Sequence, residues 1–209
     1  MIYVYALAHG LRQAPGIPGI DDAPLTLRRC AGFDVVTSEH DAKTESTEEA
    51  VLAHARVVEA MMPLATALLP ARFGLAFDDA AGLEAAVEER AGDLEASLER
   101  VRGRVELGVR VVGEQGEPRR ASTGRDYLEA RRDQLAEVDG LHDSLAARAE
   151  ASTRGSSGGR LVLSGAYLVD PERIPTFREA LERLESEHPE LTFALTGPWP
   201  PYSFAAVAE

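Results

Sequence analysis

The sequence has 209 residues, of which 35 are acidic and 22 are Lys or Arg, and its formal net charge is −13. This excess of negative charge argues against nucleic acid and anionic membranes as partners, because both carry the same sign. Apolar residues make up 44% of the chain. A chain of this length can bury roughly 70% of its extended surface, which is enough for one large core or two small ones.

The single cysteine, Cys30, cannot form an internal disulfide, and the five histidines lack the spacing of a metal site. We therefore expect no metal and a reducing compartment, the cytoplasm. Segment 1–10 has no basic region and only a short apolar run, which predicts a strand rather than a signal peptide. Segment 61–77 is interrupted by two prolines and an arginine, so no membrane span is expected and the protein should be soluble.

In the first half of the chain, β-rich or alternating runs predict strands, and apolar residues at helical spacing predict helices. The expected strands are 2–8, two runs within 25–39 that are parted by a turn at Ala31 and Gly32, and 72–77. The expected helices are 47–62 and 80–101. Ser46 or Thr47 is the expected N-cap of the first helix.

The second half opens with an alternating, half-exposed strand at 105–112 and a polar loop at 113–124. A long amphipathic helix follows at 124–150, with a narrow apolar stripe that suits docking along another helix. The small residues of 151–160 predict a flexible linker. A strand at 161–169, a helix from Pro171 and a strand at 191–197 complete the chain.

This order of elements predicts an α+β fold built from two small ferredoxin-like (split βαβ) domains. We expect an N-terminal domain at 1–102 and a C-terminal domain at 103–209, the latter containing the long helix 124–150 and the flexible loop 151–160. A single continuous sheet is the alternative.

Catalytic signatures are missing from the sequence. It contains no GxSxG elbow, no GxGxxG loop after a strand, no Walker loop and no HExxH motif. Cys30, beside Arg28 and Arg29, could be an activated thiolate, but a lone cysteine in a strand is more often a small core residue. We therefore predict no enzyme, no catalytic residue and no cofactor.

Two segments contain candidate binding residues. In LLPARFG, Arg72 and Phe73 follow an apolar run, and Arg72 could contact a partner carboxylate or satisfy groups of its own chain. The string GPWPPYSF at 197–204 places three prolines around the only tryptophan. Prolines cannot donate ladder hydrogen bonds, so the chain must leave its sheet there.

The string GPWPPYSF resembles the C-terminal signature of the gas vesicle protein GvpF/GvpL family. The resemblance extends over most of the chain and is weakest at 11–41 and 151–160. It includes YVYAL at 3–7, HARVVEA at 54–60, LLPARFG at 68–74, VELGVRVV at 105–112, GRDYLEARR at 124–132 and AYLV at 166–169. The F and L types are not separated by these residues.

The resemblance implies a cytoplasmic or vesicle-associated protein that helps to build gas vesicles, without enzyme activity or cofactor. Its implied partners are the main gas vesicle shell protein and other gas vesicle accessory proteins. Two hypotheses stay open: an assembly factor that keeps the shell protein from aggregating, and a purely structural minor component of the shell. An unrecognised small-molecule enzyme is a third.

The candidate partner-binding or signature residues are Arg72, Phe73, Trp199, Pro200, Pro201, Tyr202 and Phe204. The alternative for the C-terminal group is structural, with Trp199 packed on its own domain and the prolines fixing a rigid exit from the sheet.

Overall fold

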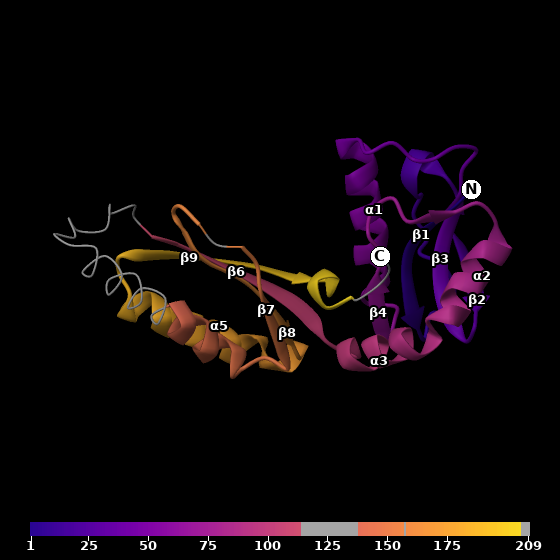
Figure 1. Cartoon of the computed structure of the whole chain (residues 1–209). Helices are drawn as coiled ribbons and strands as arrows, with labels where there is room; N and C mark the ends of the chain where they lie inside the picture. Colours follow the sequence, from indigo (N-terminus) through magenta and orange to yellow (C-terminus); the bar gives the residue numbers. More distant parts are fainter. Residues whose placement is uncertain (114–137, 157, 206–209) are drawn as a thin grey trace. The chain divides into compact units, whose positions relative to one another are not determined.

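The computed structural model describes residues 1–113, 138–156 and 158–205, and the chain forms two compact units (Figure 1). Unit 1 contains Met1–Arg104 and Trp199–Glu209, and unit 2 contains Val105–Pro198. The C-terminal signature 197–204 therefore divides between the units, with Gly197 and Pro198 in unit 2 and the residues from Trp199 onward in unit 1. The predicted loop 113–124 after Gly113, and the predicted helix 124–150 up to residue 137, lie outside the described residues; of the rest of that helix, 138–146 are helical and 147–150 are not.

Unit 1 is built on a five-stranded antiparallel sheet. The strand order is β2-β3-β1-β4, and β5 also pairs with β1. The strands are β1 (Ile2–His9), β2 (Thr26–Cys30), β3 (Phe33–Glu39), β4 (Ala67–Pro70) and β5 (Ala76–Phe77). β1 occupies the centre of the sheet because its residues are almost all apolar or aromatic and suit burial on both faces.

Helices cover both faces of this sheet (Figure 1). Unit 1 contains η1 (Ile20–Asp22), α1 (Glu48–Met61), α2 (Ala80–Glu89), α3 (Ala91–Val101) and η3 (Tyr202–Phe204). On one face, Tyr3 and Tyr5 of β1 belong to a core cluster with Val57 of α1. On the other face, Leu7 of β1, Leu83 of α2 and Leu94 of α3 line one small apolar pocket.

The structure confirms the predicted first helix, α1. Thr47 caps it, because its side chain accepts a hydrogen bond from the amide of Ala50 at 3.2 Å. Glu48 and Glu49 lie in the first turn, where carboxylates favour the positive end of the helix. The apolar side of α1 faces the sheet, and the helix ends just before Pro63.

The predicted hairpin is also confirmed. Cys30 of β2 pairs with Phe33 of β3, which leaves a two-residue turn at Ala31 and Gly32. Both turn residues have positive φ angles, 48° and 89°. This is the type I′ geometry that matches the twist of a hairpin.

Two predicted elements of unit 1 were wrong in their boundaries. Of the expected strand 72–77 only Ala76–Phe77 form a strand, β5, after a turn with Gly74 at φ 88°, whereas β4 at Ala67–Pro70 was not predicted. Pro70 can end β4 because β4 lies at the edge of the sheet. The expected helix 80–101 is interrupted at Arg90, next to the poor helix former Gly92, and forms α2 and α3.

Unit 2 contains a four-stranded sheet in the order β7-β8-β6-β9. The strands are β6 (Val105–Gly113), β7 (Ala151–Arg154), β8 (Leu161–Val169) and β9 (Leu191–Trp199). The helical elements are residues 138–146, η2 (Pro171–Arg173) and α5 (Ile174–Glu187). Leu141 and Leu145 share one core cluster with Phe177 of α5 and Tyr167 of β8, so both helices pack on one face.

The flexible linker predicted at 151–160 was wrong over its first residues, which form strand β7. β7 pairs antiparallel with β8 at the edge of the sheet, where small and polar side chains are tolerated because one side of the strand is open. Within the described residues, no helix is both long and apolar enough to cross a membrane.

The predicted α+β class is confirmed by two antiparallel sheets packed with helices. The ferredoxin-like detail is not confirmed. In unit 1, three consecutive strands precede the first α-helix, because the segment between β1 and β2 forms only the short η1. In unit 2, the connection from β6 to β7 includes residues outside the described part of the chain.

Candidate partner-binding site

Two buried side chains of unit 1 hold the 71–74 segment in place. The hydroxyl of Tyr3, in β1, lies 2.9 Å from Nδ1 of His54, in α1. Nε2 of His54 donates to the carbonyl oxygen of Ala71 at 3.1 Å, and the amide of Gly74 donates to the Tyr3 hydroxyl at 3.1 Å. Because a carbonyl only accepts, we assign the His54 proton to Nε2 and the donor role toward Nδ1 to Tyr3.

Burial keeps this pair uncharged. His54 is 3% exposed, and burial lowers the pKa of its ring to about 4, although the hydrogen bond to Ala71 opposes the shift. Burial raises the pKa of Tyr3 to about 12. Both groups are therefore neutral near pH 7, and their role is to position the loop rather than to exchange protons.

Arg72 and Phe73, the candidates from LLPARFG, differ in burial. The Phe73 ring is half-buried, with its centroid 6.1 Å from that of Tyr3 and 5.9 Å from that of His54, both in edge-to-face geometry. The side chain of Arg72 is exposed. The Tyr3–His54 pair thus presents Arg72 to solvent beside a partly covered aromatic ring.

The C-terminal signature separates into anchors and exposed aromatic side chains. The anchors are the buried residues Pro200, Pro201 and Phe204. Trp199 and Tyr202 are 43% and 41% exposed. The indole and the phenol are therefore partly packed and partly open to solvent, on a backbone that two buried prolines hold.

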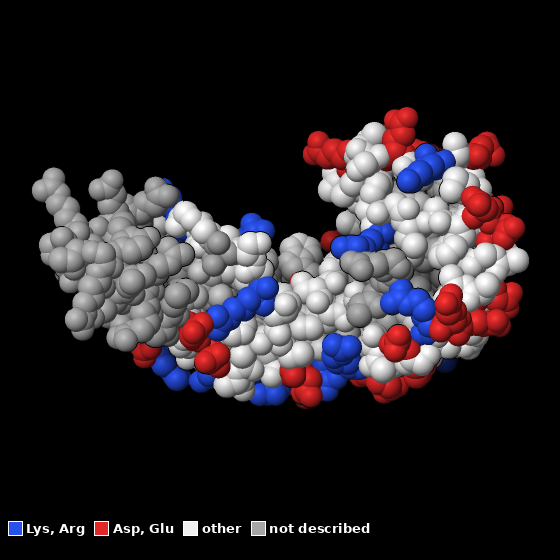
Figure 2. Space-filling model, viewed as in Figure 1, with Lys and Arg blue, Asp and Glu red and all other residues white. Residues whose placement is uncertain are grey.

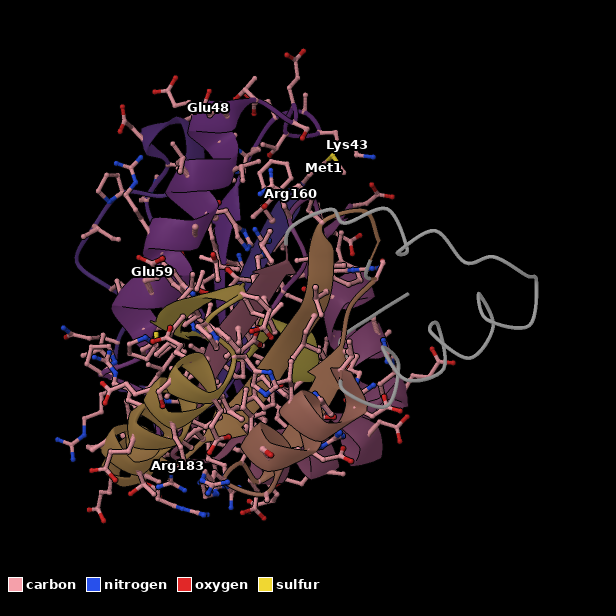
Figure 3. All side chains as sticks on the ribbon, turned by 90° about the vertical axis from the view of Figure 1, so that its left-hand side faces the viewer. Met1, Lys43, Glu48, Glu59, Arg160 and Arg183 are labelled. Carbon is pink, nitrogen blue, oxygen red and sulfur yellow. The ribbon has the colours of Figure 1, made fainter. Side chains whose placement is uncertain are left out.

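Tyr202 joins the two signatures through a shared neighbour. Burial of the phenol raises the pKa of Tyr202, and the nearby Glu59 and Tyr3 raise it further. Glu59 lies toward the end of α1 in Figure 3. Tyr3 also packs edge-to-face against Phe73, so this tyrosine contacts one signature segment and acts electrostatically on the other. We refer to Arg72, Phe73, Trp199 and Tyr202 as the signature surface.

Sequence reasoning missed the supporting pair, Tyr3 and His54. The sequence did contain a sign of this pair. His54 lies on the same side of the predicted helix as the apolar Val58 and Met61, which indicates that its imidazole is buried. A histidine at such a position needs hydrogen-bond partners in the core, and a tyrosine in an apolar strand can supply one.

The structure argues against a thiolate at Cys30. The thiol is buried, and burial raises its pKa, with Glu84 raising it further. A thiol that stays protonated is a poor nucleophile. In the part of the chain that the structure describes, no group of three His, Cys, Asp or Glu residues could hold a metal ion.

Comparison with known proteins identifies related sequences along the whole chain. The family model for the gas vesicle synthesis protein GvpL/GvpF matches residues 1–206. Gas vesicle protein F1 of Halobacterium salinarum is 30% identical over 176 residues, which cover 83% of this chain and 76% of that protein. Gas vesicle protein L of a Streptomyces species is 35% identical over 190 residues, which cover 77% of this chain and 70% of that protein.

Solved structures share the fold. The crystal structure of gas vesicle protein GvpF from Microcystis aeruginosa has a TM-score of 0.81 at 20% identity and covers 99% of both chains. That of GvpF from Anabaena sp. also has a TM-score of 0.81, at 18% identity, covering 100% of this chain and 97% of the other. Because the family match spans nearly every residue, the chain belongs to the gas vesicle protein GvpL/GvpF family.

Proposed function

We propose that this protein is an assembly factor that binds the main gas vesicle shell protein and keeps it from aggregating while the vesicle forms. Membership of the GvpL/GvpF family supports a gas vesicle role. The observation that carries the proposal is the pairing of exposed Trp199 and Tyr202 with buried Pro200, Pro201 and Phe204. This arrangement offers aromatic contact area on a fixed backbone.

Physical chemistry favours such residues as contacts. Tryptophan and tyrosine are enriched among the side chains that dominate binding energy in protein interfaces. A fixed backbone lowers the ordering cost of association, because the aromatic side chains keep few free torsions. The net charge of −13 supports the proposed protection against aggregation. Complexes of this protein with an apolar subunit would repel one another and stay dispersed.

The proposal places the protein in the cytoplasm and at the growing vesicle, with other gas vesicle proteins as further partners. It assigns no catalytic step. A purely structural role in the shell predicts a different distribution, because the protein would then remain in washed vesicles. Quantifying it in purified vesicles before and after washing with denaturant separates a transient assembly factor from a retained shell component.

The direct test is co-expression of the full chain with the main shell protein, followed by affinity capture and measurement of soluble shell protein. We expect capture and a rise in soluble shell protein. Replacing Trp199 and Tyr202 together by Ala should reduce capture about tenfold or more, as loss of two central aromatic contacts does. Leu64→Ala is the matched control, because Leu64 is 48% exposed and lies outside the signature surface.

Folding must be checked in parallel, because Trp199 is partly packed. A double variant that keeps the Tm of the parent and loses capture supports the contact. A parent protein that neither captures the shell protein nor raises its solubility, with both proteins expressed, overturns the proposal.

A further inference from the structure

Three neighbouring depressions in unit 1 lie beside α1 and share lining residues. Their volumes are about 490, 500 and 480 Å³. Asp21, Thr47 and Ala50 line both the first and the second, while Glu49 and Arg56 line both the second and the third. We call these three adjoining depressions together the α1 groove. It is bounded by segment 17–23, segment 39–47 and the exposed side of α1 as far as Arg56.

The wall at 17–23 is fixed to the core by Tyr5 of β1. The Tyr5 hydroxyl accepts a hydrogen bond from the amide of Ile20 at 2.9 Å and lies 3.0 Å from Oγ of Ser38. Gly19 packs so closely that an added Cβ would lie 2.4 Å from the Tyr5 hydroxyl oxygen. Oγ of Ser38 lies 2.7 Å from Nε2 of His40, in the opposite wall. The groove is therefore preformed.

The lining of the groove is strongly acidic. Seven carboxylates line it, against two basic side chains, Lys43 and Arg56, and one of the seven, Glu39, is already paired with Arg28 at 2.6 Å. The carboxylates are those of Asp21, Asp22, Glu39, Asp41, Glu45, Glu48 and Glu49. Figure 2 shows acidic side chains gathered at the end of unit 1 where α1 begins. This density of like charge favours a positively charged occupant.

Apolar surface lies among these charges. Leu52, on the open side of α1, is 54% exposed, and Ile17 is exposed on the facing wall. Ala50 and Ala53 line the groove on the side where α1 meets the core. The Arg56 guanidinium nitrogen Nε donates to the carbonyl oxygen of Leu52 at 3.3 Å, which keeps this basic side chain along its own helix.

We propose that the α1 groove binds a positively charged segment of the main gas vesicle shell protein that also carries apolar side chains. The inference rests on the proposed function and adds a second contact, separate from the signature surface. Glu48, at the groove, and Glu59, beside Tyr202, lie at opposite ends of α1 (Figure 3). Eleven residues of helix separate the two contacts by roughly 16 Å.

Charge complementarity identifies this occupant. Lysine or arginine side chains of the segment would pair with the exposed carboxylates, while apolar side chains would cover Leu52 and Ile17. The carboxylates are solvent-exposed, so added salt should weaken the contact by screening. An acidic segment would be repelled from the same groove, and a neutral one would gain no charge attraction there.

The test uses full-length variants in which a pair of carboxylates is replaced by lysines. The measured quantity is the amount of co-expressed shell protein that each variant captures. Asp41→Lys with Glu45→Lys changes two groove carboxylates that lie outside any helix. Glu88→Lys with Glu89→Lys is the matched control, because it makes the same change in net charge on α2, against the opposite face of the sheet. We expect the groove variant to lose about tenfold in capture at low salt and the control to stay within about twofold.

A second pair tests the apolar part of the groove. Leu52→Gln removes the exposed leucine of the groove, and Leu64→Gln removes a leucine of similar exposure, 48%, outside it. Leu52→Gln alone should reduce capture, by about threefold or more. Raising the salt concentration should weaken capture by the parent protein and narrow its difference from the Asp41/Glu45 variant.

The outcomes separate the two proposals. Capture by the parent, with the Asp41/Glu45 and Leu52 variants equal to their controls, overturns the groove and leaves the proposed function intact. Loss of capture in the groove variants alone supports both. No capture by the parent overturns both. Equal loss in the groove and control variants shows a response to net charge only and overturns the groove.

Discussion

The hydroxyl of Tyr167 lies 3.0 Å from Nδ1 of His142 in unit 2, which repeats the contact between Tyr3 and His54 in unit 1. In both units the tyrosine comes from an inner strand of the sheet and the histidine from a helix packed on it. In unit 2 the second ring nitrogen, Nε2, lies 3.2 Å from Oγ of Ser152 in β7. The same polar pair thus joins helix to sheet twice in one chain.

Removing the Tyr3 hydroxyl should destabilise unit 1. Tyr3→Phe leaves Nδ1 of His54 and the amide of Gly74 without their partner, so the free energy of unfolding should fall by about 1–3 kcal/mol. Urea denaturation measures the change. Tyr202→Phe is the control, since it removes a hydroxyl from a residue that is 41% exposed, and it should change stability by less than about 0.5 kcal/mol. Equal losses in the two variants would contradict this role of Tyr3.

Acid should destabilise the fold through His54 before most carboxylates titrate. Burial holds the pKa of this ring near 4, below its ordinary 6.5, so the unfolded chain binds a proton at a higher pH than the folded chain does. The contribution of His54 is complete above pH 6.5 and is lost as the pH falls toward 4. Between pH 7 and pH 5 the expected loss is about 2 kcal/mol.

The test of this pH dependence is a His54→Gln variant, which cannot titrate at this position. Urea denaturation of the parent and the variant at pH 7, 6 and 5 should give a flatter stability profile for the variant. Burial also lowers the pKa of His142, so some pH dependence should remain in the variant. Parallel profiles for the two proteins would show that His54 is not the titrating group.

Asparagine at position 31 should stabilise the β2–β3 hairpin. Ala31 has a φ of 48°, which is costly for a residue with a Cβ, and Asn-Gly is the favoured pair for this turn type. Ala31→Asn should raise the free energy of unfolding by about 0.5–1 kcal/mol. The same substitution at the exposed Ala42, where φ is not positive, should give no gain in thermal or urea unfolding.

Alanine at position 19 should disturb the wall of the α1 groove. The added Cβ would lie 2.4 Å from the Tyr5 hydroxyl oxygen, so either the phenol or the 17–23 segment must move. The expected cost is about 1–3 kcal/mol in urea unfolding. Gly16→Ala is the matched control, because nothing lies within 4 Å of its added Cβ. A Gly19→Ala variant as stable as the control would show that this contact relaxes without cost.

Local chemistry explains which elements were predictable from the sequence. The start of α1 follows from Thr47 and two glutamates, and the hairpin follows from a two-residue turn with Gly32. The break at Arg90 and the pairing of β7 with β8 were not predicted, because no proline marks the first and no apolar alternation marks the second. A polar edge strand has no apolar pattern to detect, so 151–154 resembled a linker.

The sequence predicted which residues are candidates for the site, but not how each of them is buried or exposed. The unusual proline and tryptophan string identified the C-terminal residues, but it did not show that Pro200 and Phe204 are buried while Trp199 and Tyr202 are partly exposed. That difference arises when η3 packs on unit 1. The α1 groove was not predicted, because its lining comes from three separate segments of chain.

The outer strands of both sheets end in proline or carry arginine. Pro70 ends β4 and Pro198 lies in β9, while Arg28 lies in β2 and Arg154 in β7. Prolines and charged side chains at such positions hinder the addition of a further strand. Under the proposed function, these edges would keep the protein from being recruited as a strand into aggregates of its partner.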